Sequence, residues 1–267
     1  MTTLPLFPML VLELQSHCNR ECSFCARTHD RSGARKDAGG VPVRKSMPTD
    51  QVLRLLGEAH ALGFRGATTF YLYSEPFLDP RLITIAGRAK DLGMYTFVNT
   101  NGDVLRKDAA LRREAAKVFR HIEVGLYEAV TESEFKEQSA WWKSNLPTNV
   151  VFAPLARMGA RPGNKMAQPI DYSGSACVRP AEKCIITYDG RSPICCYDIR
   201  CEWPIPNAFE SSLKDVWWNA ERTLTADVLK KPGGRATYNL CSTCCMPPSC
   251  PPTPVGWDKA PSLKRKP

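Results

Sequence analysis

Cysteines are the residues of this chain whose spacing points most directly to chemistry. The 267-residue sequence contains 12 cysteines, and three of them, Cys18, Cys22 and Cys25, follow the spacing Cys-x3-Cys-x2-Cys. A short loop with this spacing can place three thiolates around one face of a four-iron cubane, which leaves the fourth iron without a protein ligand. An open coordination position lets a substrate or cofactor bind the metal. The alternative is a zinc site, in which His17 or His29 would supply a closing ligand.

The remaining cysteines form a second group, because none lies between Cys25 and Cys177. In a chain of this length, clustered cysteines more often bind metal or carry out redox chemistry than staple a small disulfide scaffold. The members of this group are Cys177, Cys184, Cys195, Cys196, Cys201, Cys241, Cys244, Cys245 and Cys250.

Composition favours a globular enzyme of the cytoplasm. The chain is 43% hydrophobic and 24% charged, and it has no apolar run of the roughly 18 residues that a membrane span needs. The apolar stretch at residues 4–14 has no basic leader and runs directly into the first cysteine motif, so we interpret it as a strand rather than a signal peptide. The net charge of +9 is interpreted as a solvated basic surface, and a nucleic-acid partner is not favoured.

Five short apolar runs alternate with amphipathic segments over the first 155 residues. Strands are expected at residues 9–14, 67–73, 95–99, 121–126 and 149–153, with helices between them that begin at Thr49, Leu82, Asp103 and Thr131. The third of these helices is expected over residues 103–117, and Thr131 with Glu134 predicts a capping box for the fourth. A later helix is expected from Ser212 to about Lys230. Strands separated by helices predict parallel βα units. We therefore expect an α/β fold, a partial (β/α) TIM-like barrel, with a small cysteine-rich β-hairpin and helix domain after it.

Polar side chains follow the ends of these predicted strands, where active sites of such barrels lie. They are Tyr73, Ser74 and Glu75 after the second strand, Asn99 and Asn101 at the third, Tyr127 and Glu128 after the fourth, and Arg157 after the fifth.

The N-terminal half resembles the radical S-adenosylmethionine (SAM) superfamily. That family has the same cysteine spacing, with an aromatic residue before the last cysteine, and Phe24 fills this position. The segment from Tyr73 to Pro76 is similar to the family's Gly-Gly-Glu-Pro segment, with Ser74 as a departure, and the segment from Asn99 to Gly102 is similar to its Thr-Asn-Gly segment. The resemblance implies a [4Fe–4S] cluster whose open iron is chelated by SAM. It implies SAM-binding roles for Phe24, Tyr73, Ser74, Glu75, Asn99 and Asn101.

The C-terminal cysteines resemble the auxiliary-cluster extensions called SPASM and twitch. This resemblance assigns a second [4Fe–4S] cluster to Cys177, Cys195, Cys241 and Cys244. A hairpin turning at Asp189 and Gly190 would place Cys184 opposite Cys195 on one face, so Cys184 is a rival to Cys177 as a ligand. Two auxiliary clusters, or a zinc site, are further alternatives.

These observations predict a division into residues 1–160 as the SAM-cleaving barrel, residues 161–255 as the auxiliary-cluster domain, and a basic tail at residues 256–267. The expected reaction is reductive cleavage of SAM to a 5′-deoxyadenosyl radical that abstracts a substrate hydrogen. Dehydrogenation would follow, with the auxiliary cluster as electron acceptor. Arg157, Tyr127 and Glu128 are the candidate catalytic residues. An external one-electron reductant, flavodoxin-like or ferredoxin-like, is the expected partner.

The substrate stays open between a small molecule, a peptide and a nucleobase-derived compound. The rival reaction is a radical SAM isomerisation or crosslinking of a peptide or nucleobase-derived substrate. A more distant alternative is a metal-binding protein without catalysis that binds nucleic acid, which predicts salt-sensitive binding and no SAM turnover.

Overall fold

The fold was analysed in a computed structural model, which describes residues 4–28, 40–41, 43–154, 171–244 and 246. Six parallel strands form one sheet in the order β5-β4-β3-β2-β1-β6. Their bounds are β1 Met9–Leu12, β2 Ala67–Thr69, β3 Tyr95–Thr100, β4 His121–Leu126, β5 Asn149–Pro154 and β6 Lys183–Ile186. The five strands predicted from the apolar runs are confirmed, and so is the α/β partial-barrel class.

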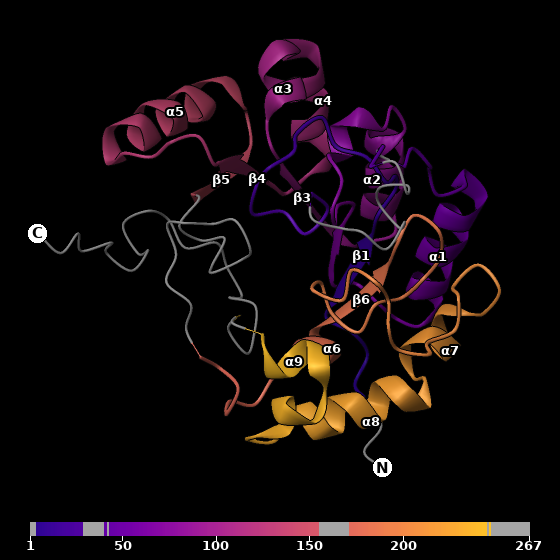
Figure 1. The fold of residues 1–267 in the computed structure, drawn as a ribbon. Coiled ribbons are helices and arrows are strands. Elements are labelled where there is room, and N and C mark those ends of the chain that lie inside the picture. Colours follow the sequence, from indigo (N-terminus) through magenta and orange to yellow (C-terminus); the bar gives the residue numbers. More distant parts are fainter. Residues whose placement is uncertain (1–3, 29–39, 42, 155–170, 245, 247–267) are drawn as a thin grey trace, which may run out of the picture.

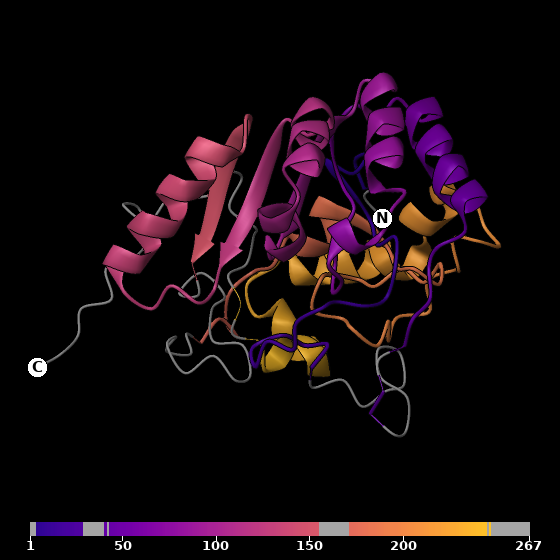
Figure 2. The same cartoon turned by 90° about the horizontal axis from the view of Figure 1, so that it is seen from above.

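Helices cover one face of this curved sheet. They are α1 Thr49–Ala61, α2 Leu82–Asp91, α3 Asp103–Lys107, α4 Ala109–Val118 and α5 Glu132–Asn145, and Figure 2 shows them in an arc along the sheet. Helix α1 buries Val52, Leu55, Leu56 and Ala59 as one stripe, and full burial of each larger aliphatic side chain stabilises the fold by about 1.5–3 kcal/mol. The capping box of Thr131 and Glu134 predicted for α5 is present.

Two expected helices are each divided by a capping residue. The helix expected over residues 103–117 breaks at Asp108, whose side chain accepts a hydrogen bond from the Leu111 amide at 2.9 Å and begins α4. The helix expected from Ser212 to about Lys230 becomes α7 Leu213–Trp217 and α8 Ala220–Leu229, because Asn219 caps the second. Asp and Asn side chains compete for backbone donors in this way.

The hairpin predicted at Asp189 and Gly190 forms its turn but not its second strand. Gly190 has φ +81°, and the Thr187 amide donates to the Arg191 carbonyl at 2.9 Å. Residues 191–200 are irregular, and Pro193 has no N–H for a strand ladder. The first strand of the expected hairpin, β6, instead pairs in parallel with β1.

The C-terminal segment therefore packs against the barrel rather than standing apart (Figure 1). Its short helices are α6 Arg179–Glu182, α9 Asn239–Ser242 and the 3-10 turn η3 Gly234–Thr237. The indoles of Trp217 and Trp218 donate to the carbonyls of Pro5 and Leu4. No described helix combines the length and apolar character needed to cross a membrane.

Candidate functional site

The three N-terminal cysteines lie in a loop that follows β1 at the carboxyl edge of the sheet. The loop turns tightly, since the Cys25 amide donates to the Cys22 carbonyl at 2.9 Å. Burial raises the pKa of the Cys18 thiol and raises that of Cys22 to about 11, and the neighbouring thiolates add to the shift at Cys22. The three predicted ligands thus lie in one loop, near enough for the charges of their thiolates to interact.

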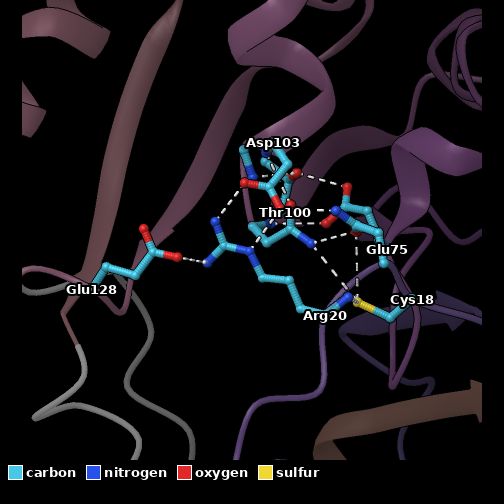
Figure 3. A network of polar contacts seen from close by, with 9 residues as sticks. Cys18, Arg20, Glu75, Thr100, Asp103 and Glu128 are labelled. Atoms are coloured by element: carbon cyan, nitrogen blue, oxygen red, sulfur yellow. Dashed lines mark hydrogen bonds and ion pairs between the residues drawn. The ribbon is translucent and has the colours of Figure 1, made fainter.

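An arginine inside the cysteine motif ties this loop to two other strand ends. The Arg20 Nε donates to Asp103 Oδ2 at 2.7 Å, and its Nη1 lies 3.4 Å from Glu128 Oε1. Figure 3 shows the guanidinium between these two carboxylates, with Cys18 and Glu75 beside the network. The Asp103 side chain also raises the pKa of Arg20 and keeps it charged. Arg20 thus fixes the cysteine loop against the segments that follow β3 and β4.

Amides complete this attachment of the cysteine loop. The Asn101 side-chain nitrogen donates to Asn19 Oδ1 at 2.8 Å and lies 3.7 Å from the Cys18 sulfur. The Arg20 backbone amide approaches the same sulfur at 3.4 Å. Nitrogen donors directed at a thiolate stabilise its charged form, which is the form that binds iron.

Glu75 is buried between the loop after β2 and the end of β3, with an exposed fraction of 2%. Its Oε1 accepts from the Thr100 hydroxyl at 2.7 Å, and its Oε2 accepts from the Asn101 amide at 2.8 Å. Burial nevertheless raises the pKa of Glu75 to about 7, while these hydrogen bonds oppose the rise. The carboxyl group therefore holds neighbouring strand ends together and titrates near neutrality.

Several polar atoms at this edge are buried without a partner. Among the described residues, Ser74 Oγ, Asn99 Oδ1 and His17 Nδ1 have no hydrogen-bond partner. Buried polar atoms are normally satisfied, so unmatched ones at a strand-end site indicate a bound molecule with complementary groups. SAM offers amine, carboxylate and ribose hydroxyl groups. The residues present therefore fit SAM, and Ser74 and Asn99 are among those predicted to bind it.

The other predicted residues of this edge are distributed as follows. Phe24 is buried, with its ring centroid 5.0 Å from that of Tyr127 in an edge contact. The Glu128 side chain is 75% exposed and pairs with Arg20. The Tyr73 amide donates to Glu13 Oε1 at 2.9 Å, and its hydroxyl donates to the Cys196 carbonyl. Arg157 lies outside the described residues, so its role stays a prediction.

Sequence reasoning missed one arginine at this site. Arg27 is 2% exposed, its Nη1 donates to the Arg20 carbonyl at 3.3 Å, and its Nε has no partner. Its charge lowers the pKa of Cys18, although burial raises that pKa more strongly. A buried cation beside thiolates fits a negatively charged iron–sulfur cluster. Only its position two residues after Cys25 could have suggested it.

The four cysteines predicted for the auxiliary cluster line one cavity. Cys177, Cys195, Cys241 and Cys244 line it together with Arg179, Arg235 and apolar side chains. Burial raises the pKa of Cys241 to about 12, and the neighbouring Cys177 and Cys244 contribute. The chemistry of this donor set, four thiolates around a buried space, fits a four-iron cluster with full protein ligation.

The rival ligand Cys184 does not reach this cavity. It lies on β6 opposite Leu10 of β1, is 0% exposed, and belongs to the hydrophobic core. The geometric argument for it assumed the second hairpin strand, which does not form. Cys184 is therefore a core residue, and the four cavity cysteines stand as the predicted set. Among the described residues, no three His, Cys, Asp or Glu side chains are gathered closely enough for a single metal ion.

Comparisons with known proteins agree with this arrangement. Residues 12–132 match the family model described as the radical SAM superfamily, and residues 177–245 match the SPASM model, described as an iron–sulfur cluster-binding domain. The S-adenosyl-L-methionine-dependent 2-deoxy-scyllo-inosamine dehydrogenase of Niallia circulans is 24% identical over 251 residues, which cover 90% of this chain and 93% of that protein.

Solved structures share the fold. The crystal structure of BtrN in complex with AdoMet and 2-DOIA superposes with a TM-score of 0.68 at 22% identity, covering 90% of this chain and 93% of that one. The structure of histidine-tagged anSMEcpe with bound AdoMet has a TM-score of 0.58 at 12% identity, covering 94% and 93% of the two chains.

Proposed function

Because this chain belongs to the radical SAM superfamily and carries a SPASM-type iron–sulfur domain, we propose that it oxidises a small-molecule substrate by SAM-dependent dehydrogenation. Two features support oxidation over a redox-neutral rearrangement. The chain has a second cysteine cavity in addition to the strand-end site, and its relative over 90% of the chain is a dehydrogenase. The observation that carries the proposal is this pairing of an open three-cysteine site with a four-cysteine cavity.

Each site has a distinct task in this proposal. Cys18, Cys22 and Cys25 would hold the first cluster, which when bound supplies the electron that cleaves SAM and so starts removal of a substrate hydrogen atom. Cys177, Cys195, Cys241 and Cys244 would hold the auxiliary cluster, which when bound supplies an acceptor for one electron. An external one-electron donor of the flavodoxin or ferredoxin type would reduce the first site.

The chain's own residues orient and enclose the reactants. Ser74 and Asn99 offer unmatched polar atoms to SAM, and Phe24 with Tyr127 forms an apolar contact beside the cysteine loop. Arg20 holds that loop against β3 and β4, which keeps the three thiols in place. Glu128 is a candidate to receive the substrate proton, since a carboxylate at a strand end can act as a base.

One assay tests this function. The protein is reconstituted anaerobically, reduced with dithionite, mixed with SAM, and analysed by chromatography for 5′-deoxyadenosine. We expect 5′-deoxyadenosine, together with about eight iron atoms per chain, four from each cluster. A fully loaded protein that forms no 5′-deoxyadenosine would contradict the proposal.

A further inference from the structure

Two arginines near the auxiliary cysteine cavity, Arg222 and Arg235, are buried and form no ion pair among the described residues. Arg235 is 1% exposed and lines the cavity, and Arg222 is 0% exposed and donates to the carbonyl of Pro193, two residues before Cys195. Neither forms an ion pair with a carboxylate of the described residues. Burying a guanidinium in this way is costly unless an anion balances it. An anion bound in the cavity would therefore offset the buried positive charge of these arginines.

The Arg235 guanidinium lies 5.7 Å from the Tyr172 ring centroid, and only one of its three nitrogens is hydrogen-bonded. Its Nη1 donates to the carbonyls of Cys244 at 3.3 Å and Met246 at 3.0 Å, whereas Nε and Nη2 have no partner. The preceding Gly234 has no room for a side chain, because a Cβ there would lie 2.1 Å from the Val228 carbonyl oxygen. The turn is thus built to bring Arg235 against the chain that carries Cys244.

Arg222 is a second buried arginine that the fold holds in place. It donates to the Ser192 hydroxyl and the Pro193 carbonyl, both at 2.9 Å, so it supports the segment that leads to Cys195. Its Nε has no partner, and its guanidinium carbon lies 5.2 Å from the Trp217 ring centroid. This arginine cannot leave its position without breaking these bonds.

One buried carboxylate, Asp198, lies near the cavity, but among the described residues it forms no ion pair with either arginine. Its oxygens accept instead from backbone amides, Oδ2 from Ile194 at 3.0 Å and Oδ1 from Glu202 at 2.9 Å. The anion that matches the arginines is therefore the set of four thiolates in the cavity, carrying iron.

We propose that Arg235, together with Arg222, offsets the negative charge of the auxiliary cluster and raises its reduction potential, which makes it an electron acceptor. The inference rests on the proposed function and adds residues to it. After the substrate has lost a hydrogen atom, it loses a proton to a base and one electron to this cluster, which then passes the electron to a one-electron carrier of the flavodoxin or ferredoxin type. Arg235 is a positioning residue that acts on the cluster and not on the substrate.

The test is a redox titration of the auxiliary cluster alone. In the full chain, Cys18, Cys22 and Cys25 are replaced by alanine, iron is reconstituted anaerobically, and the reduced cluster is followed by electron paramagnetic resonance. We expect Arg235→Gln to lower the equilibrium constant for reduction by tenfold or more, which is about 59 mV for a one-electron couple. Arg235→Lys keeps the charge, so its potential should fall by less than half as much as that of Arg235→Gln.

Control variants separate charge from structure. Arg65→Gln removes an exposed cation between α1 and β2 and should leave the potential unchanged. If Arg235→Gln fails to bind iron while Arg235→Lys binds it, a need for charge is supported. Loss of iron in both variants, or an unchanged potential in a loaded Arg235→Gln protein, would overturn the inference. The titration needs no SAM cleavage, so absence of 5′-deoxyadenosine would sink the proposed function without deciding the role of Arg235.

Discussion

The two cysteine sites share one feature and differ in another. Each has a buried arginine with an unmatched nitrogen, Arg27 at the strand-end site and Arg222 and Arg235 near the auxiliary cavity. Only the strand-end site also has unmatched neutral polar atoms, Ser74 Oγ and Asn99 Oδ1 among them, and an arginine, Arg20, that is paired with two carboxylates. The difference favours a polar organic ligand at the strand-end site, in addition to an anionic cluster, and an anionic cluster alone at the auxiliary cavity.

Removing one ligand from each site should give the largest difference between them. Cys22→Ala should abolish 5′-deoxyadenosine formation, because an incomplete set of thiolates cannot hold the cluster that reduces SAM. Cys244→Ala should retain SAM cleavage, because the three thiolates that would hold the SAM-cleaving cluster are unchanged. Chromatography of anaerobic reactions measures both. Equal loss in the two variants would show that the sites do not divide the work as described.

Because the Glu75 carboxyl is buried at the strand-end site, we expect the free energy of unfolding to depend on pH through this group. Its pKa is raised from 4.5 to about 7, so the folded state favours the protonated acid. The protonated Glu75 carboxyl contributes its full share of the free energy of unfolding below pH 4.5. This contribution, about 3 kcal/mol, is lost as the pH rises through 7. Urea unfolding of the iron-free protein at pH 5 and pH 8 measures it. Glu75→Gln, which cannot ionise, should flatten the dependence, and an equally steep slope in this variant would contradict the assignment.

Breaking the attachment of the cysteine loop should have a smaller effect. Arg20→Gln removes two charge-assisted hydrogen bonds to Asp103, and loss of an outer support of a metal site typically costs about 10- to 100-fold in metal affinity or activity. Iron content and the rate of 5′-deoxyadenosine formation measure the loss. Lys136→Ala is the matched control, because its ion pair with Glu132 is exposed on α5. An equal effect in both variants would argue against a role for the attachment.

The smallest effect on stability is expected for the hydrogen bond between Tyr73, at the strand-end site, and Cys196, beside the auxiliary cavity. The Tyr73 hydroxyl donates to the carbonyl of Cys196, the residue beside the cavity ligand Cys195. Tyr73→Phe should lower the free energy of unfolding by about 1 kcal/mol, as for loss of one hydrogen bond. Urea denaturation detects a change of this size, and no change would mean that this hydrogen bond does not contribute to the stability of the fold.

Local sequence patterns were sufficient for most elements of the barrel. The short apolar runs located the five strands, and capping residues such as Thr131 located the helix starts, because both signals act over a few residues. The spacing of Cys18, Cys22 and Cys25 is a signal of the same local kind, whereas the auxiliary set, which runs from Cys177 to Cys244, was predicted from the resemblance to SPASM and twitch extensions. The extent of β2 was overestimated, since the backbone amide of Tyr73 is taken by the distant Glu13 side chain, a contact that no local pattern records.

Long-range packing accounts for what the sequence did not predict. β6 pairs with β1 across more than 170 positions of the chain, which removed Cys184 from the ligand set. The buried arginines were also missed, because Arg27, Arg222 and Arg235 differ from surface arginines only in where the fold places them. Charge balance in an interior is a property of three-dimensional contacts.

The central claim is that the strand-end site alone leaves an iron open to SAM, and spectroscopy of the separated sites tests it most directly. Two variants are reconstituted and reduced, one with Cys177, Cys195, Cys241 and Cys244 replaced by alanine and one with Cys18, Cys22 and Cys25 replaced. The electron paramagnetic resonance spectrum of the first should change when SAM is added, and that of the second should not. An unchanged spectrum for the first variant, or a SAM-dependent change in the second, would contradict the account.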